Sequence, residues 1–117
     1  MTIAILLNQH LDENIYLAKL IEQRENIQKS FQEQLTICKP FGANVPFEKV
    51  SKLSEIKERL TKCHADMDIC KENIAQLELD IAEEIKELGI EGFHFPYEDK
   101  TFRYSLDADN ALDWRRS

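Results

Sequence analysis

Apolar residues in the second half of the chain recur at helical spacing. They are separated alternately by three and four residues over four heptads, which is the pattern of a coiled-coil seam. The seam consists of Leu53, Ile56, Leu60, Cys63, Met67, Cys70, Ile74, Leu77 and Ile81. Pro46 suits the first turn of a helix, and Gly89 suits the position after its end. The pattern therefore predicts a helix over residues 47–88, on the order of 60 Å long.

A second, less regular apolar stripe lies upstream and predicts a helix over residues 3–38. It comprises Leu7, Leu11, Ile15, Ala18, Ile21, Ile27, Phe31, Leu35 and Cys38. Residues 39–46, "KPFGANVP", hold two prolines, a glycine and an asparagine, which break helical structure. Long helices joined by such a short loop fold back on one another, so we expect an antiparallel helical hairpin.

Residues 92–106 change to strict two-residue alternation, which predicts a β-hairpin with Glu98 and Asp99 in its turn. In this register Phe95 lies opposite Phe102, and one face is almost wholly aromatic. That face consists of Phe93, Phe95, Tyr97, Phe102, Tyr104 and Leu106, while His94, Thr101, Arg103 and Ser105 point the other way. A lone hairpin is marginal in water, so the aromatic face must pack against something.

Residues 109–116 are expected to form a short terminal helix, capped by Asp107 or Asp109. The fold class is therefore mainly α: a long antiparallel two-helix coiled-coil hairpin, followed by a C-terminal β-hairpin and a short helix. At 117 residues the chain is expected to form a single domain, 1–117. Because the second helix has a stronger seam than the first can cover, we also expect a homodimer with a four-helix arrangement.

The formal net charge of −7 is concentrated in residues 66–91, where nine acids stand against Lys71 and Lys86. One interpretation is a solvated outer face of the coiled coil. The other is a negative surface for a basic protein partner. The candidate partner-binding residues on this surface are Asp66, Glu72, Glu78, Asp80, Glu83, Glu84 and Glu87. The negative charge makes direct binding to a nucleic-acid backbone unfavourable.

The C-terminal aromatic and arginine residues also have two interpretations. Arg103, Trp114, Arg115 and Arg116 are candidates for a partner-binding surface, because aromatics among arginines can stack on single-stranded nucleic acid. The alternative is a small aromatic core that closes one end of the bundle.

The stretch "TKCHADMDIC", residues 61–70, resembles a metal-ligand set at first sight. On one helix, however, Cys63 and Cys70 lie about 10 Å apart along the axis, too far to share one zinc ion. His64 points away from the seam. We therefore expect packing cysteines and no metal or cofactor, and only a site bridged between two copies stays open.

The sequence contains no phosphate-binding loop, no nucleophile elbow and no zinc-protease motif, so no catalytic residues are expected. It has no apolar stretch of membrane-spanning length. Three cysteines without framework spacing suit a reducing compartment, which favours a cytoplasmic location.

These features predict a small, acidic, non-enzymatic coiled-coil protein that acts by protein–protein binding as a homodimer. An alternative is an inhibitor of phage or mobile-element type, whose acidic helix mimics nucleic acid and blocks a nucleic-acid-binding enzyme. A third hypothesis is a nucleic-acid binder that uses the C-terminal aromatic and arginine surface.

Overall fold

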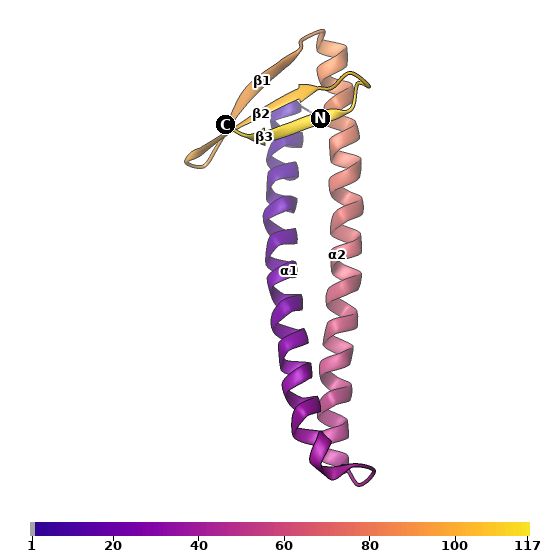
Figure 1. Cartoon of the computed structure of the whole chain (residues 1–117). Coiled ribbons are helices and arrows are strands. Elements are labelled where there is room, and N and C mark those ends of the chain that lie inside the picture. The colour runs from indigo at the N-terminus through magenta and orange to yellow at the C-terminus, as the bar shows by residue number, and fades with distance from the viewer. Residues whose placement is uncertain (1) are drawn as a thin grey trace. The chain divides into compact units, whose positions relative to one another are not determined.

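The computed structural model describes residues 2–117 and is mainly helical, with two helices followed by a three-stranded antiparallel sheet (Figure 1). The helices are α1 (Ile3–Cys38) and α2 (Phe47–Leu88), joined through a short 3₁₀ turn, η1 (Lys39–Phe41). The strands are β1 (Gly92–Tyr97), β2 (Lys100–Leu106) and β3 (Leu112–Arg116). Both helices have the bounds that the hydrophobic pattern predicts.

The chain divides into two compact units. Residues 2–16 and 70–117 form the sheet unit, which holds the first turns of α1, the last turns of α2 and all three strands. Residues 17–69 form the loop unit, which holds the rest of both helices and the connection between them.

The first two strands have the predicted register. Phe93 pairs with Tyr104 and Phe95 with Phe102, and the turn between the strands is made by Glu98 and Asp99. Glu98 has a positive φ of 55°, which a two-residue turn between antiparallel strands requires. The predicted β-hairpin over residues 92–106 is therefore confirmed.

The predicted helix over residues 109–116 is wrong, because this segment forms a third strand, β3, beside β2. The side chain of Asp107 does accept backbone N–H groups, from Asp109 (2.8 Å) and Ala111 (3.0 Å). Asn110, however, has a left-handed φ of 62°, which turns the chain back instead of starting a helix. Pairing with β2 then stabilises the segment through inter-strand backbone hydrogen bonds. A helix this short would be only marginally stable.

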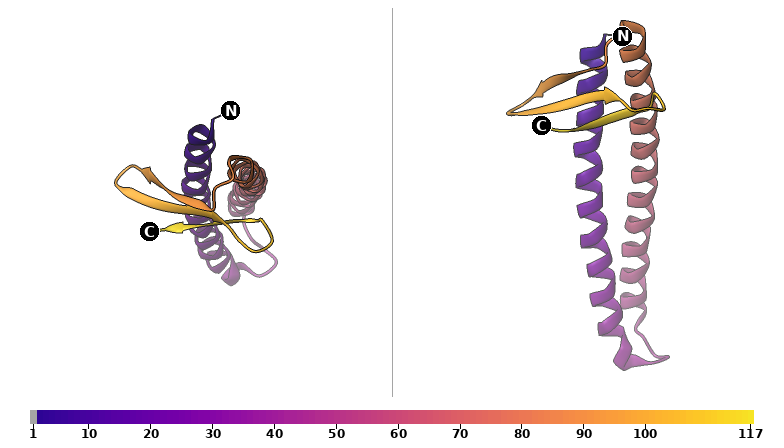
Figure 2. Two further views of the ribbon diagram at one scale, coloured as in Figure 1. Left: turned by 90° about the horizontal axis from the view of Figure 1, so that it is seen from above. Right: turned by 45° about the horizontal axis from the view of Figure 1, so that its top comes forward.

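In the sheet unit, one face of the sheet packs on the two helices (Figures 1 and 2). The buried cluster consists of Leu6, Leu7 and Leu11 from α1, Ile81 and Ile85 from α2, and Tyr104 from β2. Five further aromatic side chains of the strands pack around it: Phe93, Phe95, Tyr97, Phe102 and Trp114. The aromatic face of the sheet is thus packed against apolar side chains of the two helices, as a small sheet requires for stability.

The helix segments run antiparallel in each unit. In the loop unit the Cys63 thiol donates to the Leu20 carbonyl (3.3 Å), and in the sheet unit the Cys70 thiol donates to the Glu13 carbonyl (3.3 Å). Six of the nine seam residues are buried: Ile56, Cys63, Met67, Cys70, Ile74 and Ile81. Leu53, Leu60 and Leu77 are half-buried. The seam is thus largely covered within one chain, so a homodimer would need another surface.

The predicted stripe of the first helix is wrong at Ile15, Ala18 and Leu35, which are exposed. The buried positions near the first two are His10, Leu11 and Leu20. Near these residues, polar side chains such as His10 lie on the face of α1 that packs on α2. A stripe drawn through apolar residues alone therefore leaves that face. No helix among residues 2–117 is long and apolar enough to cross a membrane.

Candidate functional site

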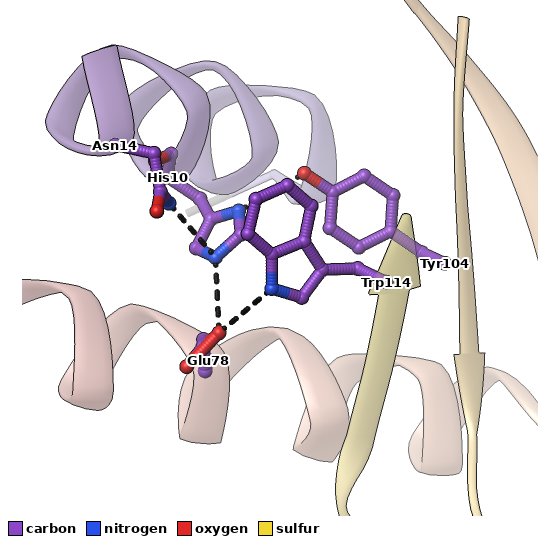
Figure 3. Close-up of polar contacts among 5 residues, drawn as sticks. All are labelled: His10, Asn14, Glu78, Tyr104 and Trp114. Atoms are coloured by element: carbon purple, nitrogen blue, oxygen red, sulfur yellow. Dashed lines mark hydrogen bonds and ion pairs between the residues drawn. The ribbon is translucent and has the colours of Figure 1, made fainter. Parts of the chain in front are cut away.

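A buried polar network connects both helices to two strands of the sheet unit (Figure 3). His10 of α1 is completely buried, and its Nδ1 lies 3.0 Å from the hydroxyl of Tyr104 in β2. Its Nε2 lies 3.3 Å from Oε2 of Glu78 in α2. The same Oε2 accepts the indole N–H of Trp114 in β3 at 2.9 Å. The Asn14 amide donates to the His10 carbonyl (2.8 Å).

The partners of His10 fix its tautomer. A carboxylate only accepts hydrogen bonds, so Nε2 carries the proton and donates it to Glu78, and Nδ1 accepts the Tyr104 hydroxyl. The Asn14 amide nitrogen also lies 3.4 Å from Nε2, but two donors cannot bond each other, so its hydrogen bond is the one to the His10 carbonyl. Burial lowers the pKa of His10 from its ordinary value, against the opposing effects of the hydrogen bond to Glu78 and its charge. Burial also raises the pKa of Tyr104, helped by the charge of Glu78. The network therefore holds a neutral imidazole and a protonated phenol near pH 7.

The chemistry open to this network is restricted by burial. A tyrosine–histidine–glutamate chain can in principle move a proton, but neither His10 nor Tyr104 has any exposed surface for a substrate to reach. The aromatic rings add to the packing, because the Trp114 ring stands edge-on to His10 with centroids 4.6 Å apart. The arrangement thus holds the sheet on the helices.

Two further polar contacts tie the start of α1 to its neighbours in the sheet unit. The Cys70 thiol reaches Oε2 of Glu13 at 3.2 Å, and the Tyr97 hydroxyl donates to Asp12. Burial, with the hydrogen bond to Glu13 and its charge, raises the pKa of Cys70 to about 11. The hydrogen bond to Asp12 is the main reason that the pKa of Tyr97 rises to about 12. Cys70 is therefore a protonated packing thiol of low nucleophilicity.

The cysteine and histidine stretch is divided as the heptad pattern predicts. Cys63, Met67 and Cys70 are buried in the seam, whereas His64 is exposed. Within residues 2–117, no three side chains of histidine, cysteine, aspartate or glutamate lie close enough to hold a metal ion.

The predicted acidic residues are divided between the two units, and those in the sheet unit differ in exposure and in partners. Asp66 belongs to the loop unit, and Glu78 is engaged by His10 and Trp114. Asp80, Glu83 and Glu87 line one hollow on α2. Glu72 is exposed and Glu84 is half-buried. The group that the structure brings together is therefore Asp80, Glu83 and Glu87.

The predicted C-terminal residues lie on both faces of the sheet. Arg103 of β2 is directly opposite Arg115 of β3, and both are exposed. Trp114 pairs with the buried Tyr104 on the other face, and Arg116 pairs with Phe102 on that same face. The structure thus brings Arg103 and Arg115 together and separates them from Trp114, whose indole is engaged by Glu78.

The sequence prediction did not include the central role of His10, Asn14 and Glu78. A signal was present, because His10 follows Leu7 by three residues and Glu78 lies between Ile74 and Ile81. Each is thus a polar residue at heptad spacing from apolar ones. A basic and an acidic side chain at such positions on two antiparallel helices can pair, as they do here.

Comparison of the chain with family models, curated proteins and solved structures found no match.

Proposed function

We propose that this chain is a non-enzymatic, cytoplasmic protein that acts by binding another protein, and that it does so as a homodimer. The observation that carries the proposal is a concentration of exposed apolar side chains in the loop unit. We call it the loop patch; it consists of Leu35, Ile37, Phe41, Phe47 and Val50. Single exposed apolar residues are ordinary, but five of them within residues 35–50, at the connection between the two helices, favour an interaction surface there.

Phe47 is the main residue of the loop patch, because 81% of its surface is exposed at the start of α2. Aromatic side chains, phenylalanine among them, are enriched at protein interfaces. Nearby, the Lys49 ammonium lies 5.9 Å from the centre of the Phe41 ring, so an aromatic and a basic group share this surface.

A second copy of the chain is the occupant that we propose for the loop patch, because the charges of the two units differ. The sheet unit has 14 acidic and six basic residues, whereas the loop unit has eight acidic and nine basic residues. Two sheet units therefore repel each other, but two loop units can approach with almost no net repulsion. A homodimer through the loop patches leaves both sheet units free for a different partner.

The test is the molar mass in solution, measured by light scattering. The chain concentration should be on the order of 10–100 μM, so that a dimer with a micromolar Kd is populated. We expect twice the monomer mass for the natural chain and the monomer mass for Phe47→Gln with Val50→Gln. Ile69→Gln is the matched control, because Ile69 is also exposed in the loop unit but lies outside the loop patch. It should stay dimeric. A monomeric natural chain, or a dimer that survives the double substitution, would overturn the proposed dimer.

A second candidate function is the inhibitor that mimics nucleic acid. It is favoured by Glu83 and Glu87, which are exposed on one face of α2 near Asp80. A mimic binds through charge alone, so replacing these acids by lysine should abolish inhibition of the target enzyme. Added salt should weaken its binding steeply.

A further inference from the structure

The sheet unit contains a groove between α2 and the loop that connects β2 to β3. One hollow of about 750 Å³ is lined by Leu79, Ala82 and Asn110, together with acidic residues of α2. A second hollow of about 340 Å³ shares these three residues and extends to Ala111 and Leu112. The two hollows form one open groove whose floor is largely apolar.

Leu79 is an exposed apolar side chain in the groove that a ligand can contact. It lies in the middle of a charged helix face, yet 66% of its surface is exposed. Ala82 beside it is buried and leaves space above the helix. An exposed leucine over an alanine floor is suited to receive an apolar side chain from another molecule.

The rim of the groove is acidic. Asp80, Glu83 and Glu87 line it, against the single base Lys86. The loop at its other side also carries Asp107 and Asp109, which are exposed but do not themselves line the groove. The sheet unit as a whole is strongly negative, so the local rim and the wider field favour the same sign of ligand charge.

The far wall of the groove is held in place before any ligand arrives. The N–H of Asp107 donates to the Ala111 carbonyl (2.9 Å), and the N–H of Asn110 donates to the Asp107 carbonyl (3.0 Å). The Asp107 carboxylate accepts two more backbone N–H groups, those of Asp109 and Ala111. A loop fixed by four hydrogen bonds loses little entropy on binding, which favours affinity.

We propose that this groove binds a basic segment of a partner protein that places one apolar side chain between lysines or arginines. The apolar side chain contacts Leu79 and Ala82, and the flanking cations pair with Asp80, Glu83 and Glu87. The inference rests on the proposed protein-binding function and names the chemistry of the partner. It does not depend on the homodimer, because the loop patch belongs to the other unit.

The experiment uses a fluorescently labelled synthetic peptide of lysines with a leucine at every fourth position, and a second peptide in which serine replaces each leucine. Anisotropy titrations measure the affinity of the full chain for both. We expect the leucine peptide to bind at least about tenfold more tightly than the serine peptide. Leu79→Gln should remove most of that difference, and Glu83→Gln with Glu87→Gln should weaken binding of both peptides.

The matched control is Leu88→Gln, because Leu88 is also exposed on α2 but does not line the groove. It should bind the leucine peptide like the natural chain. Amide chemical shifts should change in residues 75–87 and 107–112 when the leucine peptide binds.

Equal affinity for the two peptides would show binding by charge alone, which would overturn the groove and favour the nucleic-acid mimic. Absence of binding, or binding that Leu79→Gln leaves unchanged, would also overturn it. Repeating the titration with the Phe47→Gln, Val50→Gln variant separates the two proposals, since the groove should bind whether or not the chain dimerises.

Discussion

At the scale of single residues, the sheet unit depends on an imidazole kept away from water. His10 is enclosed by Glu78 from α2, Tyr104 from β2 and Trp114 from β3, with Asn14 one turn along its own helix. An uncharged histidine satisfies these neighbours with one donor and one acceptor. A second proton would leave Nδ1 as a donor toward a hydroxyl that must then reorient.

This environment predicts a loss of stability in mild acid. In the unfolded chain histidine takes up its proton near the ordinary pKa of about 6.5, while burial holds the pKa of folded His10 lower. Below about pH 6.5 the unfolded state therefore binds more protons, and the free energy of unfolding falls with decreasing pH. Denaturant titrations between pH 7.5 and 5.5 measure this fall.

The comparison variant is His10→Gln, which cannot take up a proton in this range. It should be less stable than the natural chain at pH 7.5 by about 1–3 kcal/mol, because it leaves buried partners incompletely bonded. Its stability should change less between pH 7.5 and 5.5. If both proteins lose stability in parallel, protonation of His10 does not cause the acid sensitivity.

At the scale of elements, close backbone contacts fix how β1 lies on β2. A Cβ atom on Gly92 would lie 2.7 Å from the Tyr104 carbonyl oxygen and 2.9 Å from the Ser105 Cβ. Those distances are too short, and the main chain of a paired strand cannot turn aside as a flexible side chain does. The first residue of β1 is therefore restricted to glycine.

Gly92→Ala should destabilise the chain by about 1–3 kcal/mol, the usual cost of overpacking a well-filled site. Glu91→Ala, one residue earlier, is the control, because Glu91 is exposed and lies before the strand. Thermal melts of the two variants give the difference. A Gly92→Ala protein as stable as the control would show that the strand can move away from Tyr104.

The elements also show what could be predicted from the sequence. Heptad spacing and two-residue alternation each act over many residues, so both helices and the register of Phe95 with Phe102 follow from local pattern. Residues 112–116, "LDWRR", are too few to distinguish the two periods. Their structure is decided by the free edge of β2 and the left-handed turn at Asn110, which are tertiary facts.

The candidate surfaces were predictable to a different degree. Charge counting identified the acidic part of α2, but not that Glu78 turns inward to Trp114. The groove also could not be predicted, because its second wall belongs to a loop that was expected to begin a helix. Composition thus identifies the sign of a surface, whereas its shape depends on which strand packs beside it.

At the scale of the whole molecule, charge is divided unevenly between the units. The 14 acids and six bases of the sheet unit repel one another, on average, across a small volume. The screening length falls from roughly 20 Å at 20 mM salt to about 6 Å at 300 mM. Added sodium chloride should therefore stabilise this unit.

We expect the melting temperature to rise by about 2–4 °C between 20 and 300 mM sodium chloride, a change that corresponds to roughly 0.5 kcal/mol in a domain of this size. The variant with Glu83→Gln and Glu87→Gln should show a smaller rise, because it starts with less repulsion. A melting temperature that falls with salt would mean that favourable ion pairs outweigh the repulsion.

The bond from Trp114 to Glu78 has one more consequence, which concerns how folding can be observed. Trp114 is the only tryptophan in the chain. Its indole N–H is held by the Glu78 carboxylate, and its ring packs against the rings of His10 and Tyr104. Detaching the sheet from the helices would expose that indole to water and move its emission to longer wavelength. Tryptophan fluorescence therefore reports on one contact of this protein, the packing of β3 on α1 and α2, without any added label.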